Sequence, residues 1–593
     1  MQRGDGVSKI PTTSQNQGSP WHALNTTQIL STTWMVLNKL GFTSTIEGQI
    51  ETQADTNLAT PHAYHGNKTH QKGPRSADLR RLPLRARHES EYEKETSNKK
   101  KSAHDVDIVQ KKGKPRFLKH NTYEKDPSLL MSQLEAVCAG CYKLLIPDHV
   151  PSTRPVYNDK HELMKVCSDA IHNFKDIIED PLKESDLHIR SLDEGLLTIE
   201  MLERLDQWAA CANIDLTAPV QDEWIISDSS RQAMEGEDDF IIDDGDQLEK
   251  EEYQRNIKSK IAFCGDWFQQ TELNPNDPKR VIIHEFIKNI SQDLINFRIV
   301  KGLALCLVAS FLFEEDDLHR KNMSKNGKRI DFDMSFWNIL YDYKYMVGSV
   351  FDRYLRSVSS SSSGLLSRIF NSIAPGNRFD TDEEDIKKFP NFKKSQPFYW
   401  PTTGQIPEFL LYLLPGMFVP ENAFTPADNK VFALLEKHPV FIYYKYRTFL
   451  KYILTDENMY RDVVKLNMDE NLEHAPPHVR AGEKIIDTFA NHLAARINYF
   501  EKILLEMPDF KKFMHEDGDR AFAEIRREFA ARQANFELKA EDNPEYEQFA
   551  QNTLDNIDVK FAKIKAMAVD GCYATFAEGE SNESLRRALN QIF

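Results

Sequence analysis

The stretch EEDDLHRKNMSKNGKRIDFDMSFW, residues 314–337, decides how this chain is interpreted. It follows a strongly apolar segment, and its first half carries an acidic residue, a histidine and an asparagine in the pattern D-x-H-x-x-N. Its second half carries an extended triplet with a carboxylate, Ile330, Asp331 and Phe332. Between them lies SKNG, residues 324–327, which favours a tight hairpin turn. The sequence therefore predicts that Asn322 and Asp331 face each other across a hairpin.

Such a pair suits a magnesium site. Mg²⁺ takes oxygen ligands and usually keeps several waters, so one Asp and one Asn with phosphate oxygens suffice. Phosphoryl transfer from a nucleotide needs a metal held in this way, together with a carboxylate near the acceptor hydroxyl. The alternative is a charged helix end followed by a loop, in which His319 and Asn322 form local caps.

The region upstream is typical of a small α+β lobe. DVDIVQ and RFLKH predict a hairpin whose turn contains Gly113, and apolar residues spaced by three and four predict a helix over 128–145. TRPVYNDKHELMKVCSDAI predicts a second hairpin, around Asn158 and Asp159. A nucleotide site also needs a strand Lys paired with a helix Glu, and Lys119 and Glu135 offer that pair. The alternative is that Lys119 and Glu135 are ordinary charged residues of the surface.

The composition narrows the class of protein. A length of 593 residues implies more than one domain, and a net charge of −16 argues against a nucleic-acid binder. Seven cysteines without regular spacing predict a reducing compartment, with Cys138 and Cys141 as ordinary helix-face residues. The start of the chain lacks a signal-peptide pattern, and the longest apolar run, 302–313, predicts a buried helix. We therefore expect a soluble chain without a transmembrane segment.

Changes in composition predict the domain organisation. We expect a disordered polar tail over 1–104, a small lobe over about 105–225, an acidic insertion at 235–252, a large lobe over about 255–420 and a helical C-terminal domain over 421–593. Within that last domain the helix FIYYKYRTFLKYIL, residues 441–454, interleaves aromatic residues with Lys445, Arg447 and Lys451. Such a helix either binds an anionic ligand or is a core helix whose cations extend along it.

The motifs together resemble a known family. D-L-H-x-x-N followed by I-D-F-D is similar to the phosphoinositide-kinase-like branch of the kinase superfamily, where D-R-H-x-x-N and I-D-F-G stand. FLKH, TRPVYND, EEDDLHxxN, KRIDFDMSF and FPNFKKSxPFYWPT, taken in order over about 115–405, resemble the remote kinase-like effectors of intracellular bacteria of the Legionella and Coxiella type. The polar C-terminal segment AEGESNESLRRALNQIF is similar to type IV secretion signals, although a frayed amphipathic helix fits it equally well.

The resemblance implies an α+β, two-lobed protein-kinase-like fold with a helical C-terminal domain. It implies a phosphotransferase that uses ATP and Mg²⁺ on a protein or phosphoinositide hydroxyl, secreted into the cytoplasm of a host cell. It assigns roles to six residues: Lys119 contacts phosphate, Glu135 is its partner, Asp317 orients or deprotonates the acceptor hydroxyl, His319 organises the loop or contacts phosphate, and Asn322 and Asp331 bind the metal. Asp316 is the alternative to Asp317.

Two departures from the family pattern keep a second function open. The chain has no glycine between Gly73 and Gly113, where a kinase normally has a glycine-rich hairpin over the phosphates. Asp333 replaces the glycine that usually follows Asp-Phe. The alternative to an active enzyme is therefore a catalytically inactive pseudokinase scaffold that binds a host partner.

Overall fold

A computed structural model describes most of the chain from residue 82 onward. The described residues are 82–94, 105–120, 130–160, 162–163, 165–217, 244–269, 279–315, 318–333, 335–336, 381–391, 424–468, 485–550 and 553–569. All of them belong to one compact unit, which comprises residues 79–410 and 419–593. The fold is mixed α+β and mostly helical, which confirms the predicted class at this level.

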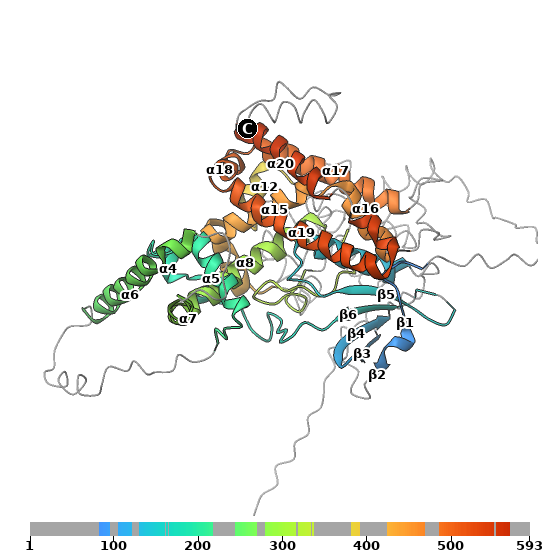
Figure 1. Cartoon of the computed structure of the whole chain (residues 1–593), viewed down its shortest axis with the longest axis horizontal. Helices are drawn as coiled ribbons and strands as arrows, with labels where there is room; N and C mark the ends of the chain where they lie inside the picture. The colour runs from blue at the N-terminus through green and yellow to red at the C-terminus, as the bar shows by residue number, and fades with distance from the viewer. Residues whose placement is uncertain are drawn as a thin grey trace, which may run out of the picture. The chain divides into compact units, whose positions relative to one another are not determined.

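Six strands form one sheet, in the order β1-β5-β6-β4-β3-β2 (Figure 1). Neighbouring strands are antiparallel except for β1 and β5, which are parallel. The strands are β1 Arg87–His88, β2 Glu93–Lys94, β3 Asp105–Lys111, β4 Lys114–His120, β5 Thr153–Tyr157 and β6 Lys165–Asp169.

Both predicted hairpins are confirmed, as β3 with β4 and β5 with β6. The first turns at Lys112 and Gly113, whose φ angles of 53° and 71° are both positive, as a two-residue type I′ turn requires. The predicted helix is also confirmed, as α3 Leu130–Leu145. It packs against β5 and β6 on one side and against helices of the C-terminal half on the other.

The other regular elements of the described chain are helices (Figure 1). The longer ones are α5 Ile199–Cys211, α6 Asp244–Gln269, α7 Arg280–Asn289, α8 Ser291–Leu312, α15 Pro439–Leu454, α16 Glu457–Asn467, α17 Ile485–Glu506, α19 Gly518–Asp542 and α20 Thr553–Val569. The shorter ones are η2 Glu89–Glu91, η3 Glu184–Leu187, α4 Arg190–Asp193, α12 Glu383–Lys388, α14 Pro426–Leu434, η5 Leu435–Lys437, α18 Pro508–Glu516 and η6 Pro544–Phe549.

Helix α8 lies at the centre of the hydrophobic core, and α15 packs along it. By length and composition α8 would be able to cross a membrane, but 83% of its most apolar window is buried inside the protein. A buried core helix has these same properties, as the sequence predicts for this segment. The core is continuous from Leu134 in α3 to Ala568 in α20. Helices on both sides of residue 420 therefore share one core, and the proposed domain boundary there stays a prediction.

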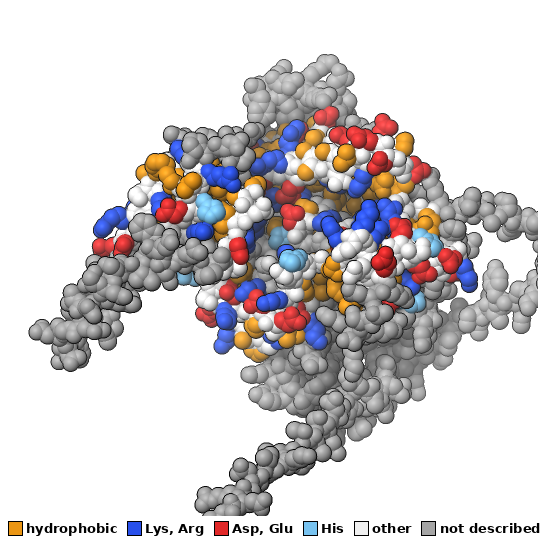
Figure 2. All heavy atoms as spheres, turned by 60° about the horizontal axis from the view of Figure 1, so that its bottom comes forward, with side chains coloured by type: hydrophobic (Ala, Val, Ile, Leu, Met, Phe, Trp, Pro, Cys, Tyr) orange, Lys and Arg blue, Asp and Glu red, His pale blue; other side chains and the backbone are white. Residues whose placement is uncertain are grey.

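The structure changes three expectations about the organisation of the chain. Residues 82–94 belong to the sheet rather than to a polar tail, because β1 and β2 are held by partners distant in sequence. The buried helix expected at 302–313 is longer than the apolar run, because it is α8, which begins at Ser291 directly after α7. The acidic insertion is described only from Asp244, where it begins helix α6. On the face shown in Figure 2, acidic, basic and hydrophobic side chains of the described residues are mixed.

Candidate functional site

The segment that follows α8 forms the predicted hairpin. Met323 and Arg329 form an isolated antiparallel bridge, and the Ile330 N–H donates to the carbonyl of Asn322 at 3.0 Å. The turn is closed by the Ser324 N–H, which donates to the Lys328 carbonyl at 2.9 Å. The expected SKNG turn is therefore present. It pairs the backbone of Asn322 with that of Ile330, the residue that directly precedes Asp331.

Two glycines allow this turn to lie directly on α8. A Cβ atom at Gly302 would be 2.0 Å from the carbonyl oxygen of Asn326, and one at Gly327 would be 1.9 Å from the carbonyl oxygen of Gly302. Gly327 also has a φ of +71°, a conformation that L-residues rarely adopt. Any side chain at either position would force backbone atoms to shift, so the hairpin is fixed against the core helix by backbone contact.

A buried ion pair anchors the other side of the hairpin. The side chains of Arg329 and Glu315 are both 0% exposed, and Arg329 Nη2 lies 3.1 Å from Glu315 Oε2. Arg329 also donates to the Asn322 carbonyl at 3.1 Å, and the Tyr142 hydroxyl of α3 donates to Glu315 at 3.4 Å. Ser335 donates to the same carboxylate. Burial lowers the pKa of Arg329, but the charge of Glu315 and those of its other neighbours together raise it above its ordinary value, so the guanidinium stays charged.

This anchoring places Asp331 next to the sheet. Lys119 on β4 lies with its Nζ 2.7 Å from Asp331 Oδ1, 3.2 Å from Glu135 Oε2 and 3.3 Å from Asp333 Oδ2. Asp331 has a φ of +63°, an uncommon conformation for a residue other than glycine. Such backbone strain persists where surrounding contacts hold it and is found most often at functional sites.

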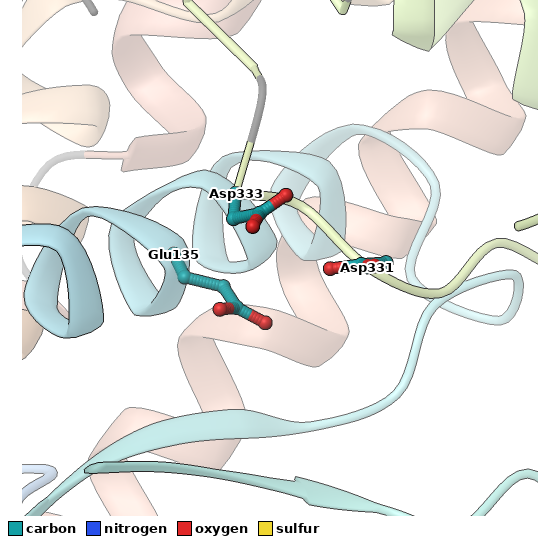
Figure 3. Close-up of side chains that lie close together, drawn as sticks. All are labelled: Glu135, Asp331 and Asp333. Atoms are coloured by element: carbon teal, nitrogen blue, oxygen red, sulfur yellow. The ribbon is translucent and has the colours of Figure 1, made fainter. Parts of the chain in front are cut away.

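The three carboxylates converge on one point (Figure 3). Glu135, Asp331 and Asp333 each offer an oxygen within 4.8 Å of the others. In their ionised forms, three carboxylates and the one ammonium of Lys119 leave a local charge of −2. Because hard divalent cations prefer carboxylate oxygens, this group has the donor set and the charge to hold one.

Electrostatics keep Lys119 charged within this group. Its side chain is 11% exposed, and burial alone would lower its pKa. The carboxylates of Glu135, Asp333 and Asp331 instead raise the pKa well above its ordinary value. Lys119 is therefore a fixed cation that faces a cluster of anionic oxygens.

The remaining predicted site residues lie near this group or outside the described chain. His319 accepts a hydrogen bond from the Lys321 N–H at 3.2 Å, and its carbonyl accepts one from the Asn322 N–H at 3.0 Å. Burial lowers the pKa of His319 to about 4, so its ring is neutral at neutral pH. These contacts fit a residue that organises the loop. Asp316 and Asp317 lie outside the described residues.

Sequence reasoning left two features of the site unassigned. The first is Asp333, whose carboxylate accepts a hydrogen bond from Lys119. Its one signal in the sequence is that it stands where the family pattern has a glycine. The Arg329 and Glu315 pair carried no pattern that separates it from other charged residues in the stretch. Both features depend on contacts between α3, β4 and the hairpin, which local sequence does not encode.

The basic and aromatic helix predicted at 441–454 is α15, and its cations are buried. Lys445, Arg447 and Lys451 are 2%, 5% and 1% exposed. Arg447 pairs with Glu524 at 2.6 Å, Lys451 pairs with Glu528, and Lys445 donates to two backbone carbonyls of α12. In this arrangement they are core cations with internal partners, and they offer an anion no exposed surface.

The two cysteines of the CxxC segment, Cys138 and Cys141, are buried in α3 and unbonded. No protein-family model matches the chain, and no curated protein matches it either. The family resemblance drawn from the motifs therefore stays a prediction.

Proposed function

We propose that this chain is an Mg²⁺- and ATP-dependent phosphotransferase with a two-lobed, kinase-like fold, whose small lobe comprises the sheet and α3. The observation that supports it best is the contact of one ammonium, Lys119 Nζ, with both Glu135 at 3.2 Å and Asp331 at 2.7 Å. A strand, a helix and a distant hairpin contribute these three side chains. A strand Lys held by a helix Glu, opposite a metal-binding Asp, is the arrangement that a nucleotide phosphotransferase needs.

In this proposal each residue has one task. Lys119 binds the nucleotide phosphates, and Glu135 keeps its side chain in place. Asp331 holds Mg²⁺ with Asn322, while Asp333 adds a further carboxylate. When bound, the metal neutralises charge on the phosphates and on the group being transferred. Asp317, or Asp316 beside it, orients the acceptor hydroxyl, with His319 organising the loop.

The substrate and the place of action rest on the family resemblance. A protein or phosphoinositide hydroxyl is the proposed acceptor, and the cytoplasm of a host cell, reached by type IV secretion, is the proposed compartment. The segment after Asp331 carries no recognisable code for the acceptor. Both acceptor classes therefore enter the test.

The test is phosphate transfer by the full chain from radiolabelled ATP with Mg²⁺, offered separately to lysate proteins and to phosphoinositide vesicles. Asp331→Asn and Lys119→Met should each lower transfer by about a hundredfold or more, since each removes a charge that stabilises the transferring group. The matched controls are Asp519→Asn and Lys565→Met, which change an exposed ion pair elsewhere in the chain. Full transfer by folded Asp331→Asn protein would refute the proposal.

One observation favours a second candidate, a pseudokinase scaffold. Lys119 is surrounded by three protein carboxylates, including Asp333 at the position where a glycine is usual. Together with the absence of glycine over 74–112, this arrangement also suits a purely structural ion-pair group. If the chain is a scaffold, the wild-type protein should not turn over ATP. Its binding to a partner should be the same with and without nucleotide, and the same in Asp331→Asn.

A further inference from the structure

A second group of charged side chains lies where the sheet meets the C-terminal helices, and it is basic. We call Arg85, Arg87, Arg116, Arg154 and Lys539 the cation cluster. Arg87, Arg116 and Arg154 belong to β1, β4 and β5, Arg85 precedes β1, and Lys539 belongs to α19. A group of Lys and Arg side chains is visible right of the centre in Figure 2.

The guanidinium groups of the cation cluster share very few acceptors. The Ser152 hydroxyl accepts from Nη2 of Arg85 and from Nη2 of Arg154, at 3.2 Å in each case. Asp169 is the carboxylate beside them: its Oδ1 lies 3.8 Å from Arg154 Nη2 and also pairs with Arg116. Three guanidinium groups therefore meet around one neutral hydroxyl and one carboxylate.

The positive charge of the cation cluster is not balanced by the described chain. Within the described residues, Arg85, Arg87 and Lys539 form no ion pair with a carboxylate, and Asp169 is the carboxylate that pairs with Arg116 and Arg154. Burial and then the charge of Arg154 lower the pKa of Arg85 to about 10. Burial and then the charge of Arg85 lower that of Lys539. Mutual repulsion of this kind is unexpected in a chain with a net charge of −16, unless an anion relieves it.

Two hydrogen-bond donors of the cation cluster also lack acceptors. The Nε atoms of Arg116 and Arg154 are buried and have no hydrogen-bond partner. Leaving a buried donor without an acceptor is costly, and a bound anion satisfies guanidinium donors of this kind. The charge of the cation cluster and its two available donors both suit a small oxyanion.

We propose that the cation cluster binds a multiply charged phosphate anion of the pyrophosphate or phosphate-monoester type. Guanidinium groups match phosphate oxygens in geometry and bind them through charge-assisted hydrogen bonds. The side chains of Arg116 and Arg154 are only 12% and 20% exposed, which favours a small ligand over a broad macromolecular surface. Bound there, the anion joins the sheet that carries Lys119 to helix α19, and so stabilises the packing of the C-terminal helices on the sheet.

The test is titration of the full chain with pyrophosphate, followed by calorimetry and by thermal unfolding. EDTA is present throughout, so that phosphate binding through Mg²⁺ at the candidate active site does not contribute. Pyrophosphate should raise the unfolding temperature, because a ligand that binds only the folded chain stabilises it. Arg154→Gln should weaken pyrophosphate binding about tenfold or more, and the exposed control Arg526→Gln should change it less than about twofold.

Two further experiments identify the source of the phosphate and provide a second variant in case the first does not fold. Vesicles that contain phosphatidic acid, compared with phosphatidylserine at equal charge, show whether a lipid phosphate monoester is bound. If Arg154→Gln fails to fold, Lys539→Gln on the surface of α19 should still weaken pyrophosphate binding by about threefold. Absence of binding, equal affinity in Arg154→Gln and Arg526→Gln, or tighter binding of single-stranded DNA than of pyrophosphate would overturn the proposal.

Discussion

Replacing Gly302 by Ala probes the contact that fixes the hairpin on α8. In a helix interior this change normally stabilises by about 1 kcal/mol, because Ala has the higher helix propensity. At Gly302 the new Cβ would lie 2.0 Å from the Asn326 carbonyl oxygen and 2.6 Å from its carbon, where ordinary contact begins at 3.4 Å. Both neighbours are backbone atoms, so the hairpin must move by about 1.4 Å, the difference between 3.4 and 2.0 Å.

Overpacking of this kind usually costs about 1–3 kcal/mol, and sometimes more. After the gain in helix propensity, the net loss should therefore reach about 2 kcal/mol. Because the same hairpin carries Asp331, its displacement should also lower any phosphate transfer that the chain performs. We expect a lower urea midpoint by circular dichroism. We also expect the rate of phosphate transfer to fall by a larger fraction of its wild-type value than the free energy of unfolding does.

Gly265 in α6 supplies the matched control, since a Cβ there would have nothing within 4 Å. Gly265→Ala makes the identical chemical change in a helix and should raise the urea midpoint slightly, by up to about 1 kcal/mol in free energy. The difference between the two variants isolates the close approach at Gly302. A Gly302→Ala protein as stable as Gly265→Ala, with normal transfer, would refute the reasoning.

Three further predictions concern stability, each measured as the urea midpoint. Arg329→Met leaves the buried Glu315 carboxylate uncompensated and should destabilise the fold by about 3–5 kcal/mol. A cost no larger than that of replacing an exposed Arg by Met would contradict the buried pair. Burial lowers the pKa of His149 from 6.5 to about 4, so the unfolded chain binds the extra proton between these values and stability should fall as pH drops from about 6.5 toward 4. The loss should reach about 3 kcal/mol, and His149→Gln should flatten that part of the pH profile. The Asp293 carboxylate caps the start of α4, where it accepts hydrogen bonds from two backbone N–H groups at 3.1 and 2.8 Å. Asp293→Ala should therefore cost about 1–3 kcal/mol of stability, and Asp293→Asn less. Equal costs for the two variants would argue against this cap.

The strongest agreement between sequence and structure lies where the signal is local. Gly113 and the SKNG stretch predicted two hairpin turns, and both are present, because positive φ angles and turn residues act within a few positions. Helix α3 and the second hairpin followed from apolar spacing in the same way. The proximity of Lys119 to Glu135 and to Asp331 was expected as well, although from the order of motifs rather than from any local pattern.

The differences lie where long-range contacts decide. Strands β1 and β2 have only two residues each, too few for any period, and exist because β5 and β3 pair with them. The sequence left open whether Lys445, Arg447 and Lys451 bind an anion or belong to a core helix, and only their partners on α12 and α19, from distant parts of the chain, show a core helix. Asp316 and Asp317 lie outside the described residues, so the acceptor-orienting carboxylate remains a prediction.

The sequence by itself determined the turn chemistry, the helix faces and the residue types at the candidate site. Only the tertiary structure decided which charges meet: that Asp333 joins Glu135 and Asp331 around Lys119, and that the cation cluster draws on both β5 and α19. The physical reason is that turns and periodicity depend on neighbours along the chain, whereas the placement of charge depends on elements hundreds of residues apart that pack around one core.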